Sequence, residues 1–171
     1  MAIVKASYTK KSGGAKASIK YIEHRPGKDG VKINRILFGV DGAMGRYEAN
    51  KMIDEAEEGS IFYRFIISPD PNKEDNEKDV YLREITEKTM HELEERLQTH
   101  VAWVAAEHSD HAPHRHVHVV AVLPGKLYRE DLRALTQAAT AATLAQRHER
   151  DAALERKGRE AQEKEQAQWE I

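Results

Sequence analysis

Cysteine is absent from all 171 residues of the chain. This absence excludes disulfide bonds, thiolate metal sites and cysteine nucleophiles, and it is typical of proteins from the reducing cytoplasm. No run of apolar residues is long enough to span a bilayer, and the N-terminus lacks the apolar segment of a secretory signal. The sequence therefore predicts a cytoplasmic protein without a membrane segment, large enough for one ordinary domain with its own core.

The net charge is also small, at −2 for the whole chain, but the basic residues are unevenly distributed. Residues 1–35 hold nine lysines and arginines against two acidic residues, Glu23 and Asp29. A locally basic region on a near-neutral chain favours binding to a polyanion, although a solubilising surface is the alternative. The candidate nucleic-acid contacts in this region are Lys10, Lys11, Lys16, Lys20 and Arg25.

Hydrophobic periodicity predicts an α+β domain. Loose apolar alternation predicts a strand at 3–9, and runs of apolar, β-branched or aromatic residues predict strands at 61–67, 101–108 and 114–123. A hairpin or further strand is expected at 31–38. Helical patterns cover 15–24, 47–58, 80–98 and 129–145, whereas 41–45 and 71–79 are predicted to be loops, the latter exposed, and 109–113 a bend. Residues 146–168 favour a helix with little to bury, either extended or frayed. We therefore expect a central antiparallel sheet of about five strands with flanking helices and a helical C-terminal tail.

Five of the nine histidines lie within residues 107–120. His114, His116 and His118 alternate along a predicted strand, so their side chains share one face of the sheet. His108 ends the preceding strand, and an antiparallel neighbour would bring it close to the others. Imidazoles on a buried strand are costly without partners, and three of them with open positions make a catalytic metal site. The alternative is a metal-storing or solvated histidine run.

A tyrosine lies among cations on the first predicted helix. Tyr21 has Lys16, Lys20 and Arg25 within about one turn on either side. Cations near a phenol favour its reactive phenolate form, and they also hold a phosphodiester in place. Tyr21 is therefore a candidate nucleophile for phosphoryl transfer. Its neighbours Ile19 and Ile22 leave open the alternative that it is an ordinary core residue.

Taken together, these motifs resemble the HUH endonucleases of the relaxase type, in the tyrosine class that includes plasmid-mobilising and T-DNA border nucleases. The HUH motif is matched by His116-Val117-His118, and the upstream His-x-Asp element by His108-Ser109-Asp110. The family's first motif, which carries the nucleophile, is matched by residues 19–22 followed by Arg25. Residues 62–69 and 103–108 also resemble the family's strands in amino-acid sequence and in their order along the chain.

The resemblance covers about residues 1–128, which implies a relaxase catalytic domain there and a helical extension at 129–171. It implies that the protein binds single-stranded DNA at an origin of transfer and nicks it to begin conjugative mobilisation. Tyr21 would attack the scissile phosphorus, giving a 5′-phosphotyrosyl link and a free 3′-hydroxyl. Accessory DNA-binding proteins and conjugation coupling proteins would be its partners. In this family the HUH histidines lie on central strands of a five-stranded antiparallel sheet, and the tyrosine helix packs across them.

The resemblance also implies a divalent metal ion held by His108, His116 and His118, which would act as a Lewis acid on the phosphate. Asp110 would orient one of these histidines. Nitrogen ligands suit manganese, zinc or nickel better than magnesium, which prefers oxygen, so the identity of the ion stays open.

Two assignments within the site also stay open. The interval from His108 to the HUH pair is one residue longer than the family's pattern, which makes His114-Arg115-His116 a competing register. We favour 116/118, because Val117 suits a buried position and Arg115 does not; His114 then becomes an additional or exchanging ligand. His24, one helical turn after Tyr21, is either an alternative nucleophile or a general base.

Two other functions compete with the relaxase. A rolling-circle replication initiator or a transposase would share the HUH chemistry, but such proteins usually place the tyrosine after the histidines. A non-enzymatic metal-binding or DNA-binding module is the other alternative. Metal-dependent nicking of a supercoiled plasmid would separate an enzyme from such a module.

Overall fold

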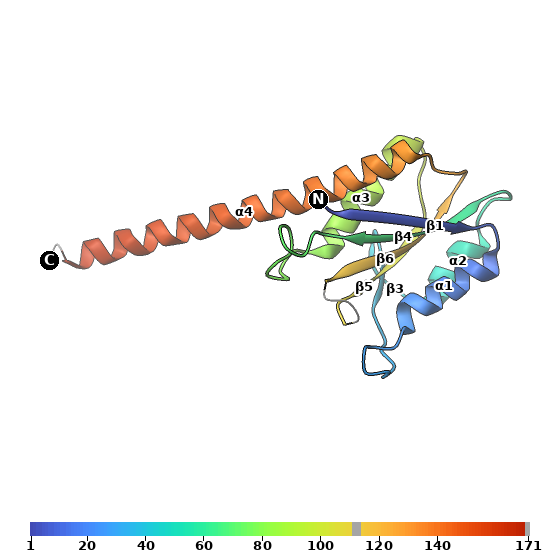
Figure 1. The fold of residues 1–171 in the computed structure, drawn as a ribbon, viewed down its shortest axis with the longest axis horizontal. Coiled ribbons are helices and arrows are strands. Elements are labelled where there is room, and N and C mark those ends of the chain that lie inside the picture. Colours follow the sequence, from blue (N-terminus) through green and yellow to red (C-terminus); the bar gives the residue numbers. More distant parts are fainter. Residues whose placement is uncertain (111–113, 170–171) are drawn as a thin grey trace.

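The computed structural model describes residues 1–110 and 114–169, which form one antiparallel sheet with helices on both faces (Figure 1). The strand order is β1-β4-β6-β5-β2-β3. The strands are β1 Ile3–Thr9, β2 Leu37–Gly39, β3 Gly42–Met44, β4 Ile61–Ser68, β5 Trp103–His108 and β6 His116–Leu123. The helices are α1 Ser12–His24, α2 Arg46–Asp54, α3 Leu82–Leu97 and α4 Arg129–Trp169. The predicted α+β antiparallel class is confirmed, with six strands where about five were expected.

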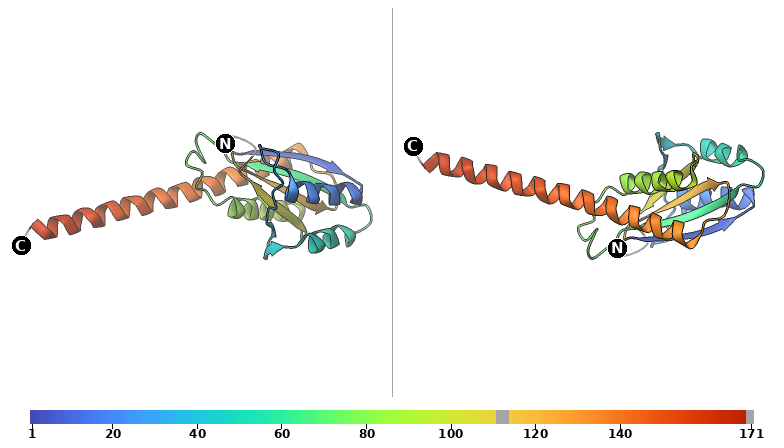
Figure 2. Two further views of the ribbon diagram at one scale, coloured as in Figure 1. Left: turned by 90° about the horizontal axis from the view of Figure 1, so that it is seen from below. Right: turned by 90° about the horizontal axis from the view of Figure 1, so that it is seen from above.

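Helices cover both faces of the sheet (Figure 2), and each face has its own hydrophobic core. On one face, α1 buries Ala15, Ile19 and Ile22, spaced as one stripe of a helix, against strand residues such as Phe62 and Val120. Helix α2 packs on the same face, and α3 and α4 cover the other. The predicted helix at 15–24 therefore exists, and it begins three residues earlier, at Ser12.

The region from 31 to 45 differs from its prediction. Residues 31–36 have no regular structure, so the hairpin or strand predicted at 31–38 survives only as β2. Strand β3 lies within the segment 41–45, which was predicted to be a loop. The turn between them is Val40–Asp41, and Gly42 follows it with φ +118°. Because Gly39 and Gly42 flank the turn instead of forming it, the sequence lacks the usual signal of a hairpin with a two-residue turn.

Helix α4 is one continuous helix of 41 residues. Its first turns bury Leu135, Ala139 and Ala142 against the sheet and α3, so this part completes the core even though the predicted catalytic domain ends at 128. Farther along, the charged and alanine-rich sequence sustains the helix without burying it. Residues 151–169 are largely exposed and continue past the sheet (Figures 1 and 2).

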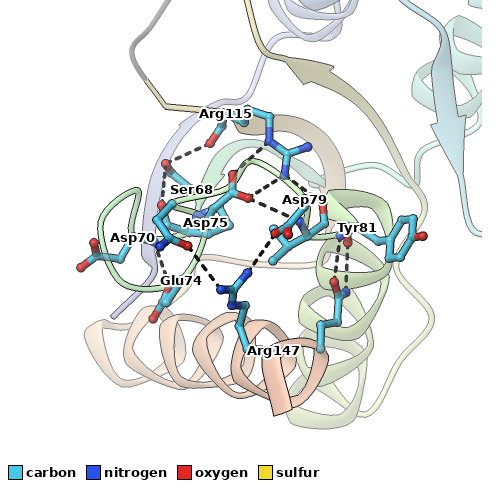
Figure 3. Close-up of polar contacts among 12 residues, drawn as sticks. Ser68, Asp70, Glu74, Asp75, Asp79, Tyr81, Arg115 and Arg147 are labelled. Atoms are coloured by element: carbon cyan, nitrogen blue, oxygen red, sulfur yellow. Dashed lines mark hydrogen bonds and ion pairs between the residues drawn. The ribbon is translucent and has the colours of Figure 1, made fainter. Parts of the chain in front are cut away.

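The segment 69–81 is only partly an exposed loop. Glu74 and Asp75 are buried, with 2% and 4% of their surface exposed, which corrects the prediction for 71–79. Buried carboxylates need partners. Glu74 accepts a hydrogen bond from the backbone of Asp70 (2.8 Å), and Asp75 pairs with Arg115 (2.7 Å) (Figure 3). Arg147 of α4 ties the same segment down through Asp79, at 3.0 Å.

A membrane-spanning helix is not found among the residues that the structure describes, since none of the helices combines the required length and apolarity.

Candidate active site

Two adjacent interior strands bring three histidines together on the face that α1 covers. His108 at the end of β5 lies directly opposite His116 at the start of β6, and His118 follows two residues later on the same face. Ring centroids are 5.4 Å apart for His108–His116, 4.4 Å for His108–His118 and 4.9 Å for His116–His118. Each ring offers a nitrogen within 4.8 Å of the other two. This triad is a candidate metal site.

Hydrogen bonds determine which ring nitrogens of the triad carry lone pairs. Nε2 of His108 lies 2.9 Å from the carbonyl oxygen of Ile22; because a carbonyl only accepts, Nε2 carries the proton. Nδ1 of His108 then holds a lone pair, and it is buried without a hydrogen-bond partner in the described part of the chain. His116 donates from Nδ1 to the carbonyl of His114 (3.3 Å), which leaves its Nε2 beside Nε2 of His118 (3.2 Å). Three imidazole donors and an unsatisfied buried nitrogen fit a divalent transition-metal ion.

Burial also keeps the triad uncharged. It lowers the pKa of His108 to about 4 and that of His118 to about 3, with smaller contributions from neighbouring histidines and arginines. Burial also lowers the pKa of His116. An imidazole must be deprotonated to bind a metal, so these rings are in the ligand form at neutral pH.

Arg115 distinguishes the two possible histidine registers. Its side chain donates to Asp75 through Nε (3.0 Å) and Nη2 (2.7 Å), and to the carbonyl of Val80 (2.9 Å), in the segment 69–81 (Figure 3). Val117, the residue between the two paired histidines, is fully buried. His114 is exposed, and its imidazole is not part of the triad; it contributes its carbonyl instead. His111 and Pro113, within the bend predicted at 109–113, lie outside the described residues.

Helix α1 places Tyr21 beside the triad. The Tyr21 ring meets His118 edge-on, with centroids 6.4 Å apart and planes at 88°. Its side chain is 48% exposed, so it is not the core residue that the alternative interpretation required. The guanidinium of Arg25 lies 5.5 Å from the ring centroid. Tyr21 and His118 line one cavity of about 280 Å³ together with the cations Lys5 and Arg64.

His24 contacts a carboxylate. Its Nε2 lies 3.1 Å from Oε2 of Glu23, and Nε of Arg46 lies at the same distance from that oxygen. His24 is partly buried, one helical turn after Tyr21. The structure therefore brings His24 to the end of α1 near the tyrosine, where its side chain contacts Glu23 and not a member of the triad.

Asp110 contacts an arginine instead of a histidine. Both carboxylate oxygens accept hydrogen bonds from Nη2 of Arg35, at 2.9 and 2.8 Å, and this bond lowers the pKa of the carboxyl. Within the described residues no hydrogen bond joins Asp110 to a histidine, so the predicted orienting contact is not present. Sequence reasoning missed Arg35 in this role. Nothing in the sequence could have linked two residues that lie 75 positions apart.

The predicted DNA-binding residues lie at different distances from the site. Lys10, Lys11 and Lys20 are exposed, and Lys16 pairs with Asp54 at 2.6 Å. Lys11 precedes α1, so the helix rise of 1.5 Å per residue places it about 15 Å from Tyr21. Arg25 is close to Tyr21, as described above, and so are Lys5 and Arg64, which sequence reasoning did not single out as contacts. The alternation of β1 and β4 could have indicated them, because it places both on the histidine face.

Comparison with known proteins does not assign a family, since no family model, curated protein or solved structure matches the chain.

Proposed function

We propose that the protein is a metal-dependent DNA relaxase, which nicks one strand at an origin of transfer through a 5′-phosphotyrosyl intermediate. One observation carries the proposal: the exposed Tyr21 lies edge-on to His118, 6.4 Å between ring centroids, beside three uncharged imidazoles that suit a divalent ion. A nucleophile next to a metal-binding triad suits strand transfer at a phosphodiester. The position of the triad on interior strands, with α1 packed across them, agrees with the relaxase architecture that the sequence resemblance implies.

The chemistry assigns a role to each group. His108, His116 and His118 would hold the ion, and three nitrogen donors favour manganese, zinc or nickel over magnesium. A bound ion would supply Lewis-acid polarisation of the scissile phosphate. The Tyr21 oxygen forms a bond to phosphorus while the bond from phosphorus to the 3′-oxygen breaks. The phenol loses its proton, for which His24 is the candidate acceptor, and the departing 3′-oxygen gains one.

A groove beside the triad suits a single nucleic-acid strand. The cavity that Tyr21 lines adjoins a second cavity of about 470 Å³, lined by His116 and Ile3, and both are lined by Lys5. His118 lines the first cavity and His116 the second, and both cavities lie on the same face of β1, β4 and β6. Exposed cations such as Lys5 and Arg64 attract phosphates, and an unpaired strand can follow such a groove.

Isolation of a covalent adduct tests the proposal. The protein is incubated with manganese ions and a random-sequence pool of single-stranded DNA, and species that resist denaturant are recovered and sequenced. We expect an adduct whose nucleotide remains on the peptide containing Tyr21 after proteolysis. Tyr21→Phe should bind metal and DNA but form no adduct, whereas Tyr47→Phe, at an exposed tyrosine of α2, should react like wild type.

Other outcomes would redirect the assignment. His24→Ala should slow adduct formation without abolishing it, since proton transfer typically contributes about 10²–10⁴-fold. An undiminished adduct from Tyr21→Phe would move the nucleophile to His24 or Tyr8. Metal binding with no adduct from any sequence in the pool would instead support a non-enzymatic module. A replication initiator or transposase would give the same adduct, and the recovered DNA sequence separates it from a relaxase.

A further inference from the structure

Arg35 connects the end of the tyrosine helix to the end of a histidine strand. Its Nη1 donates to the carbonyl of Arg25 (2.8 Å), the residue that follows α1, and its Nη2 donates to both carboxylate oxygens of Asp110. Asp110 lies two residues beyond His108, the last residue of β5. The Arg35 side chain is only 6% exposed and that of Asp110 is 28% exposed, so the bridge is buried mainly on its arginine side. The guanidinium thus bridges two elements that are distant in sequence.

A second contact joins the same two elements. His108 donates from Nε2 to the carbonyl of Ile22, one residue after Tyr21. The last turn of α1 is therefore tied to β5 at Ile22 and again, three residues later, at Arg25. The carbonyl of Tyr21 is itself occupied, because it accepts from the backbone of Arg25 at 2.8 Å. These contacts fix the last turn of α1, which carries Tyr21, against the end of β5.

The loop between Arg25 and Arg35 is shaped to return Arg35 to this position. The backbone of Gly27 donates to Val31 (3.0 Å), and Gly30, with φ +75°, donates back to Gly27 (2.9 Å). A glycine adopts this φ without strain. The backbone of Arg35 then donates to the carbonyl of Glu23 at 3.0 Å, which places its side chain beside the helix end. A Cβ on Gly27 would lie 3.4 Å from Oδ2 of Asp110, so the loop packs closely against the bridge.

We propose that Arg35 is a positioning residue, which together with Asp110 holds Tyr21 in place beside the histidine triad. This inference rests on the proposed function, because it gives Tyr21 the role of nucleophile. Asp110 then acts on the tyrosine helix through Arg35, and not on a metal-binding histidine. The planar guanidinium can donate to a carbonyl and a carboxylate at once in fixed directions, whereas the single ammonium group of lysine cannot reproduce that geometry.

Single-turnover kinetics of Arg35→Lys, Asp110→Asn and the double variant test this inference. The probe is the oligonucleotide recovered most often from the random pool, at saturating concentration with manganese ions. We expect Arg35→Lys to slow adduct formation about 100-fold, a loss that a displacement of about 1 Å can cause. Oligonucleotide and manganese affinities should stay within about threefold of wild type, because charge and ligands are retained. Asp110→Asn should slow adduct formation by about the same factor. The double variant should be no slower than either single variant, since the two residues act as one unit.

Several results would overturn the inference. If Asp110 orients a histidine, Asp110→Asn weakens manganese binding. The decrease in the rate of adduct formation that it causes then adds to the decrease caused by Arg35→Lys. If Arg35 is a DNA contact or only a structural residue, affinity or stability falls while the rate at saturation does not. Arg35→Ala provides a further measurement, because added methylguanidinium should restore part of the rate; absence of rescue argues against positioning. An adduct at an unchanged rate from Arg35→Lys refutes the inference alone, whereas absence of any wild-type adduct refutes the proposed function with it.

Discussion

Mild acid should destabilise the metal-free protein through its buried histidines. Burial lowers the pKa of His108 to about 4 and that of His118 to about 3, against about 6.5 in an unfolded chain. As the pH falls below 6.5, the unfolded chain binds protons that the folded protein does not bind, so the free energy of unfolding decreases. The contribution of the neutral rings is complete above pH 6.5 and is lost progressively down to the folded-state values.

The size of this decrease in the free energy of unfolding follows from the pH interval over which the unfolded chain is protonated and the folded protein is not. One pH unit is worth about 1.4 kcal/mol for each such group. At pH 5, which is about 1.5 units below the unfolded pKa and above both folded values, each ring lowers the free energy of unfolding by about 2 kcal/mol. The two rings together cost about 4 kcal/mol, a large part of the roughly 5–15 kcal/mol that stabilises a typical domain.

Urea unfolding followed by circular dichroism, with a chelator present, measures this loss. The free energy of unfolding is compared between pH 7.5 and pH 5 for wild type and for a variant carrying His108→Gln and His118→Gln. Carboxylates titrate in both proteins and cancel in the comparison. His91→Gln is the matched control, since that imidazole is on α3 with 70% of its side chain exposed.

We expect the free energy of unfolding of the wild type to fall by about 4 kcal/mol more than that of the double variant, and His91→Gln to behave like wild type. Parallel pH dependence in wild type and the double variant would refute the reasoning. Such a result would mean that the rings protonate in the folded protein as readily as in water, and that the triad is not buried as described.

Four further outcomes are expected. Between pH 7.5 and 5.5 the manganese affinity of the triad should fall less than about tenfold by calorimetry, whereas three ordinary imidazoles would lose about 10³-fold. His118→Ala should abolish manganese binding while His114→Ala keeps it; the reverse would select the 114/116 register. Neutralising Lys5 and Arg64 together should reduce the slope of log K against log salt for single-stranded DNA by about 1.4, and an unchanged slope would remove the groove from the binding surface. Leu135→Ala should lower the free energy of unfolding by about 2–5 kcal/mol in urea, because the first part of α4 is core; a negligible loss would make it an appendage.

The local pattern of the sequence was sufficient to predict the long strands, the first helix and part of the candidate active site. Loose alternation identified the first strand, and runs of apolar, β-branched or aromatic residues identified the other three long strands. The two-residue period of a strand placed His116 and His118 on one face and excluded Arg115 from it. The helical stripe of Ile19 and Ile22 located the first helix, and with it Tyr21. These features depend on residues that are neighbours in the chain, so periodicity reports them directly.

Partners that are distant in the chain were decided only by the tertiary structure. The opposition of His108 to His116 depends on how β5 and β6 align, and the edge-on contact of Tyr21 with His118 depends on how α1 crosses the sheet. The bond between Arg35 and Asp110 joins residues 75 positions apart. A sequence shows which face a side chain occupies, but the partner on that face is set by strand register and loop path. For this protein, that is why the histidines could be found from the sequence and the residue that positions its candidate nucleophile could not.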